Sequence, residues 1–188
     1  MRYIRNTILL LLLAAVCYRC GNDAEIDIPA QRATFQKYLE GVTKDWDGVS
    51  VDKELEQRHN IYRITPWPGN SSQRVAAGDR VTIEYYGFVF SSGAELGMGG
   101  LFATNNRAAA IEAGLVEDVR VLPPEDLTIR QGAGEILRGI DLGLERAGLR
   151  DTILLYLTSD LTYGDKEVGF IAAGTPTVFM VAIKGINE

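Results

Sequence analysis

The chain has 188 residues, of which 46% are hydrophobic, and this suits one ordinary domain with a short N-terminal extension. Its formal net charge of −6 disfavours a nucleic-acid partner, because phosphate backbones attract basic surfaces. A single histidine, His59, excludes multi-histidine metal sites, and we expect neither a metal nor a cofactor.

The first residues combine a basic start, at Arg2 and Arg5, with an apolar run over residues 8–16. This run is too short to span a bilayer comfortably and is typical of a secretory signal peptide. An uncleaved membrane anchor is the alternative. The leader over residues 1–19 holds three arginines and no acid, so its removal changes the net charge from −6 to −9.

Both cysteines, Cys17 and Cys20, stand at the end of this leader, so the mature chain has no disulfide framework. A cysteine at this place resembles the acylated first residue of a bacterial lipoprotein. The polar residues 21–23 resemble the start of surface or outer-membrane lipoproteins of the Bacteroidetes. We expect Cys20 to be acylated, with Cys17 as the alternative. The resemblance implies a cell-envelope protein held at the outer membrane by its lipid, on the periplasmic face or the cell surface.

Residues 20–60 are expected to form a tether and one helix, and residues 61–188 the folded domain. Pro29 can open the helix, and apolar residues recur at helical spacing as far as about Lys44. A surface helix packed on the domain is the favoured interpretation, and a dimerisation arm is the alternative. The shortness of this helix and the lack of a heptad run favour a monomer.

Five segments are predicted as strands, because their apolar residues alternate or run without interruption: 61–65, 81–87, 127–129, 153–157 and 178–183. Two further helices are predicted over residues 108–114, capped by Asn105 or Asn106, and over residues 135–147. The sequence therefore predicts an α+β fold, in which an antiparallel sheet of about five strands wraps around one short amphipathic helix. The extra helix is inserted before the fourth strand.

Three motifs follow one another along the predicted domain. They are Tyr85-Tyr86-Gly87 at the end of a strand, Ile136-Leu137-Arg138-Gly139 at the start of a helix, and Tyr163-Gly164 in a loop. Their order over residues 61–186 resembles that of FKBP-type peptidyl-prolyl cis-trans isomerases, most specifically over residues 132–164. The resemblance implies the FKBP-like form of the α+β fold and a pocket for the proline of a peptide.

The resemblance also implies the residues of that pocket. Its catalytic residues would be four aromatic side chains: Tyr85, Phe102, Tyr163 and Phe179. Its substrate-binding residues would be five aliphatic side chains: Leu127, Ile136, Leu137, Ile140 and Ile171. The chain departs from the family at Ala103, which replaces an aspartate, and at Ile140, which replaces a tryptophan. These departures imply a reduced activity.

The function implied by the resemblance is isomerisation of Xaa-Pro bonds, which assists the folding of exported proteins. Proline-containing segments of those proteins would be its partners, and the lipid would attach it to the membrane. The amide resists rotation with a barrier of about 18–20 kcal/mol. An apolar pocket that removes water favours the twisted amide, which has less charge separation, and no titrating group is needed. The alternative is a catalytically weak FKBP-like module that binds proline-containing segments.

Overall fold

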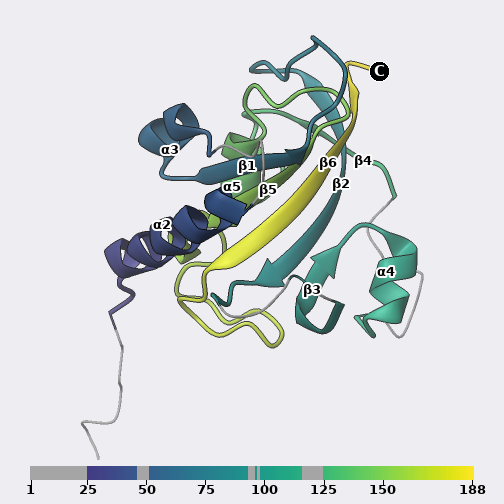
Figure 1. The fold of residues 1–188 in the computed structure, drawn as a ribbon. Helices are drawn as coiled ribbons and strands as arrows, with labels where there is room; N and C mark the ends of the chain where they lie inside the picture. The colour runs from purple at the N-terminus through teal and green to yellow at the C-terminus, as the bar shows by residue number, and fades with distance from the viewer. Residues whose placement is uncertain (1–24, 46–50, 93–95, 97, 116–124) are drawn as a thin grey trace, which may run out of the picture.

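The computed structural model describes residues 25–45, 51–92, 96, 98–115 and 125–188, and these form one antiparallel sheet of six strands (Figure 1). The strands are β1 Tyr62–Trp67, β2 Arg80–Val89, β3 Leu101–Thr104, β4 Leu127–Arg130, β5 Thr152–Leu157 and β6 Thr177–Ile186. The helices are α2 Ile28–Asp45, α3 Lys53–His59, α4 Arg107–Glu112 and α5 Arg138–Gly143. Two short 3-10 helices are η2 Met98–Gly100 and η4 Ser159–Leu161.

The strand order is β1-β5-β6-β2-β3, and β4 also pairs with β2. Strand β6 pairs along most of one edge of β2, from Val81 to Val89. The other edge is shared, since β4 pairs with residues 80–83 and β3 with residues 86–88. The sequence predicts every strand except β3, whose residues Leu101-Phe102-Ala103-Thr104 do not alternate between apolar and polar side chains.

A side chain completes the edge of β2 between β3 and β4. Asn105 is 1% exposed, and its Oδ1 accepts a hydrogen bond from the backbone N–H of Tyr85 at 2.7 Å. Its Nδ2 donates to the carbonyl oxygen of Ile83 at 2.9 Å. Asn105 therefore pairs with backbone groups that lie between the two short strands. Its neighbour Asn106 caps α4, accepting a hydrogen bond from the N–H of Ala109 at 2.9 Å.

The sheet is apolar on both faces, and α2 and α5 lie on opposite sides of it (Figure 1). Each face carries a cluster of buried hydrophobic residues, and we call these two clusters the α5-face core and the α2-face core. The α5-face core is mainly aliphatic and includes Val81, Ile83, Ile140, Leu144, Ile153, Leu155, Leu157, Phe179, Val181 and Ile183. The α2-face core is rich in aromatic rings and contains Phe35, Leu39, Tyr62, Ile64, Leu154, Tyr156 and Val178.

Helix α2 covers one face of the sheet and belongs to the folded domain. The ring of its buried Phe35 meets the ring of Phe90 edge-on at 4.7 Å and that of Tyr156 at 5.8 Å. Such pairs contribute about 0.5–1.5 kcal/mol each beyond the burial of area. The helix is therefore packed on the sheet, with bounds close to those that its apolar spacing predicts. Among the described residues, no helix combines the length and apolar character needed to cross a membrane.

Helix α5 is shorter than the helix predicted over residues 135–147, and that prediction was wrong in extent. The carboxylate of Glu135 accepts a hydrogen bond from the N–H of Arg130 at 2.8 Å, which draws it back toward β4. At the other end, Arg146 has a left-handed backbone, with φ of 60°, and its N–H donates to Val75 O at 2.9 Å. The apolar spacing continues beyond the helix because Leu144, its C-cap, and Ala147, which follows the turn, are both buried.

Candidate functional site

The four aromatic residues predicted as catalytic come from four separate segments and meet beside the α5-face core. Tyr85 lies in β2, Phe102 in β3, Phe179 in β6, and Tyr163 in the loop that follows η4. The ring of Phe102 is 5.9 Å from that of Tyr163 and 5.6 Å from that of Phe179. The rings of Tyr85 and Phe179 are 6.3 Å apart. These separations are those of interacting aromatic pairs, and we call the four residues the aromatic cluster.

Gly87 leaves the space in which two of these rings lie. It stands opposite Phe179 of β6 and opposite Ala103 of β3 in the sheet. A Cβ atom at Gly87 would lie 2.7 Å from Phe179 Cε1 and 3.0 Å from Phe102 Cζ. Glycine is therefore required at this position of the Tyr85-Tyr86-Gly87 motif for a steric reason, since any side chain would displace a ring of the cluster.

The cluster combines a buried floor with half-buried walls. Phe179 is 1% exposed, whereas Tyr85, Phe102 and Tyr163 are each partly exposed. Burial raises the pKa of the Tyr85 phenol, and burial together with the neighbouring Tyr85 raises the pKa of the Tyr163 phenol. Both groups therefore stay protonated at neutral pH and can donate a hydrogen bond. The arrangement offers apolar ring surface with phenol donors beside it.

The aliphatic residues predicted to bind substrate are not all in the same place. Ile140 belongs to the α5-face core and is 1% exposed, so it supports the site from beneath. Leu127, Ile136 and Leu137 are half-buried and pack against that core. Ile171 is buried in the loop after Tyr163, where its backbone pairs with Val168, and it is not among the residues of that core.

Two glycines bring α5 close to the sheet. A Cβ atom at Gly139 would lie 2.6 Å from Leu157 Cδ1, and one at Gly143 would lie 2.5 Å from Leu155 Cδ1. Because the two positions are four residues apart, they lie on the same face of the helix. The backbone of α5 therefore lies close to β5, and this fixes the height of Ile140 above the sheet.

Sequence reasoning missed the buried Asp141, which orders the turn before α5. Its carboxylate accepts hydrogen bonds from the N–H groups of Gly132 at 2.7 Å and Gly134 at 3.0 Å. Both glycines have positive φ, of 82° and 70°. The carboxylate thus holds the turn that leads to Ile136 and Leu137. A lone acid among the apolar residues of a short helix was the one signal in the sequence that pointed to it.

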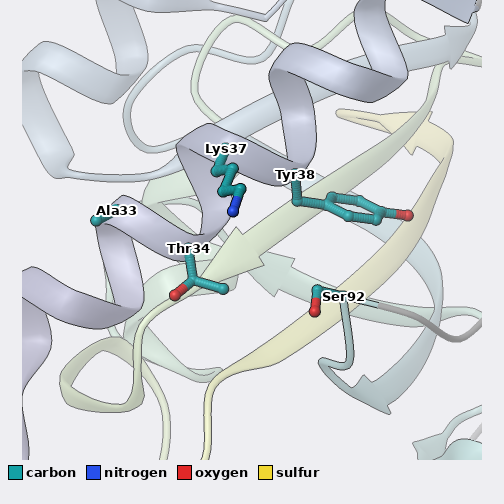
Figure 2. A pocket seen from close by; sticks show the side chains of 5 residues that line it. All are labelled: Ala33, Thr34, Lys37, Tyr38 and Ser92. Carbon is teal, nitrogen blue, oxygen red and sulfur yellow. The ribbon is translucent and has the colours of Figure 1, made fainter.

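A hollow of about 560 Å³ lies beside α2, and Figure 2 shows the residues that line it. Its lining residues are Ala33, Thr34, Lys37 and Tyr38 of α2, together with Ser92 after β2. Tyr38 packs against the α2-face core, and its ring is 5.4 Å from that of Phe90. This hollow is therefore on the other side of the sheet from the aromatic cluster and is not part of the same site.

The described residues thus define an α+β protein with one antiparallel sheet of six strands, a few helices and an aromatic cluster beside the sheet. This architecture is compatible with an FKBP-like fold. The chain is 28% identical to FK506-binding protein 1 of Aspergillus oryzae over 113 residues, which are 60% of this chain and 86% of that protein. No family model matches the chain. The similarity supports an FKBP-type family, and at the level of that family it suggests peptidyl-prolyl isomerase activity.

Proposed function

We propose that this chain is a peptidyl-prolyl cis-trans isomerase that binds proline-containing segments at the aromatic cluster. The observation that carries the proposal is the meeting of Tyr85, Phe102, Tyr163 and Phe179 at ring separations between 5.6 and 6.3 Å. Rings from β2, β3, β6 and a loop form one apolar surface with a buried floor. The similarity to FK506-binding protein 1 of Aspergillus oryzae also supports this reaction.

The reaction follows from what this surface does to an amide. When the proline ring of a substrate packs against the partly exposed Phe102, above the buried floor formed by Phe179, water is excluded from the Xaa-Pro peptide bond. The planar amide has more charge separation than the twisted one, so loss of water raises its energy more. The phenol of Tyr163 donates a hydrogen bond to a carbonyl of the bound peptide and holds the chain while the bond turns. Because no proton is transferred, the site needs no group that titrates near neutral pH.

A catalytically weak binding module is the second candidate function, and two residues favour it. Ala103 is a small residue in β3 where the family has an aspartate, and Ile140 is aliphatic where the family has a tryptophan. Loss of an indole and a carboxylate leaves the rings with fewer groups to orient a substrate. Binding without fast turnover would then be the main property of the site.

Removal of the Tyr163 hydroxyl tests the assignment. Tyr163→Phe is expected to lower kcat/KM for an Xaa-Pro peptide about two- to tenfold, since it deletes one hydrogen bond to the substrate. The measurement is catalysed cis-trans exchange, with the full chain purified in mild detergent. Tyr86→Phe is the matched control, because Tyr86 is the next residue to Tyr85 on β2, on the opposite face of the sheet, and its hydroxyl donates to Glu84 at 2.8 Å.

The outcomes separate the two candidate functions. Equal loss of activity in Tyr163→Phe and Tyr86→Phe would contradict the placement of substrate at the cluster. A wild-type chain that binds the peptide without accelerating exchange would support the binding module. A wild-type chain that neither binds nor accelerates would refute both.

We further propose that the isomerase serves exported proteins from a lipid anchor on Cys20, with Cys17 as the alternative, at the outer membrane. Both cysteines lie outside the described residues. Support comes from the basic and then apolar leader in front of them and from the lack of any other cysteine in the chain. Mass spectrometry of the mature amino terminus is expected to find an acylated cysteine as the first residue. An unmodified terminus, or one downstream of Cys20, would refute the anchor.

A further inference from the structure

The loop that carries Tyr163 is closed at its base by backbone hydrogen bonds. The N–H of Gly164 donates to Ser159 O at 2.7 Å, and the N–H of Gly174 donates to Gly164 O at 2.8 Å. Gly164 is the residue after Tyr163. The position of Tyr163 therefore depends on the two ends of the loop, Ser159 and Gly174.

Gln31 of α2 binds both of these loop ends with one side-chain amide. Its Oε1 accepts a hydrogen bond from the N–H of Ser159 at 2.9 Å. Its Nε2 donates to Gly174 O at 2.8 Å and to the hydroxyl of Ser159 at 3.2 Å. Ser159 is 1% exposed, so water cannot readily replace these bonds. The amide uses both of its ends and holds the two sides of the loop together.

Ile26, just before α2, makes a second contact with the same loop. A Cβ atom at Gly174 would lie 3.1 Å from Ile26 Cγ1, so the Ile26 side chain covers this glycine closely. Gly174 has φ of 74°, a conformation that glycine adopts without strain. Ile26 and Gln31 together form what we call the N-terminal clamp.

The clamp has a fixed position because α2 is packed on one face of the sheet through its buried side chains. Phe35, one turn after Gln31, is completely buried in the α2-face core. The helix thus connects one face of the sheet to the loop whose tyrosine joins the aromatic cluster beside the other face. The ring of Tyr163 lies 5.9 Å from that of Phe102, so the loop bound by the clamp also carries one ring of the aromatic cluster.

We propose that Gln31 is a positioning residue for the isomerase reaction, acting through Ser159 and Gly174 on Tyr163. The inference rests on the proposed function of the aromatic cluster. It assigns a role in catalysis to a helix that lies outside the residues resembling the FKBP family. Gln31 touches no substrate, and its effect is to keep the Tyr163 phenol where a bound peptide can receive its hydrogen bond.

The test compares Gln31→Ala with Gln36→Ala in the full chain in detergent. Gln36 is the matched control, because it is an exposed glutamine of the same helix, and its amide bonds to Glu40 at 3.4 Å. Gln31→Ala is expected to lower kcat/KM for an Xaa-Pro peptide about two- to fivefold, and by no more than Tyr163→Phe does, whereas Gln36→Ala is expected to leave it unchanged. Equal activities of the two variants would overturn the proposal.

A double-mutant cycle distinguishes positioning from a general loss of stability. If Gln31 acts through the Tyr163 hydroxyl, Gln31→Ala with Tyr163→Phe should be no slower than Tyr163→Phe alone. Simple addition of the two losses would show that Gln31 does not act through this hydroxyl, and would overturn the proposal.

Amide hydrogen exchange tests the clamp without relying on catalysis. The N–H groups of Gly164 and Gly174 are expected to exchange about tenfold faster in Gln31→Ala than in Gln36→Ala, because the loop opens more often. Unchanged exchange would refute the clamp. Faster exchange in a chain whose wild type has no isomerase activity would support the clamp but overturn the proposed function, and with it the catalytic role of Gln31.

Discussion

Gly87→Ala is expected to lower kcat/KM for an Xaa-Pro peptide about 100-fold, since misplacement of a site by about 1 Å has effects of this size. The new methyl would lie 2.7 Å from Phe179 Cε1 and 3.0 Å from Phe102 Cζ. Phe179 is buried in the α5-face core and has little room to retreat, so the strain falls on the ring positions and on the pairing of β2 with β6. Overpacking of this kind lowers the free energy of unfolding by about 1–3 kcal/mol.

Catalysed peptide exchange and urea unfolding, measured on the same preparations, check both parts of this expectation. Gly41→Ala is the control, because a Cβ atom at Gly41 in α2 would have no atom within 4 Å. Replacing a glycine inside a helix by alanine is expected to stabilise the chain by about 0.5–1 kcal/mol without changing its activity. Full activity in Gly87→Ala would mean that the reaction does not depend on the present positions of the Phe102 and Phe179 rings.

Local patterns in the sequence were enough to predict most of the sheet, and the failures have physical causes. Ile153, Leu155 and Leu157 belong to the α5-face core, and the residues between them belong to the α2-face core. This spacing of two is visible in the sequence because successive side chains of a strand point to opposite faces of the sheet. Helix α3 was not predicted, since its seven polar-rich residues bury only Leu55. The length of α5 was overestimated because residues buried in a turn repeat the spacing of a helix.

The candidate site was predicted from the order of its motifs and not from periodicity, because Phe179 alone has the pattern of any core residue. The contacts that hold the site were beyond sequence reasoning. Asn105 completes the edge of β2, and Gln31 reaches Ser159, which is 128 residues away in the chain. Such hydrogen bonds depend on which distant backbone groups the fold leaves unpaired, and a single sequence does not record that.

Arg63→Met is expected to lower the free energy of unfolding by about 1–3 kcal/mol, the usual cost of leaving a buried hydrogen-bond acceptor without its donor. Arg63 is 6% exposed, and its guanidinium donates to Gly143 O at the end of α5 at 2.9 Å. It also donates to Glu145 O and to the carboxylate of Asp52, which caps α3. One side chain thus joins β1, α3 and α5, and its removal leaves buried acceptors without donors.

The same pair predicts how stability depends on pH. Burial raises the pKa of Asp52, but the hydrogen bond from the N–H of Leu55 and the charge of Arg63 outweigh this and lower the pKa below its usual value of 3.8. A carboxyl group whose pKa is lower in the folded chain stabilises it above the unfolded pKa, and this contribution is lost as pH falls through the folded pKa. Part of the stability should therefore disappear below about pH 4.

Urea unfolding of wild type and Arg63→Met between pH 7 and pH 2 measures both effects. In Arg63→Met the decrease in stability on acidification should be smaller, because the Asp52 carboxylate has lost its cation. Arg146→Met is the control for stability at pH 7 only, since the Arg146 pair with Glu54 is exposed on both sides and such pairs contribute little, whereas the charge of Arg146 also lowers the pKa of Asp52. If Arg63→Met were no less stable than Arg146→Met, or kept the acid sensitivity of wild type, Arg63 would not be the link that joins α3 and α5 to the sheet.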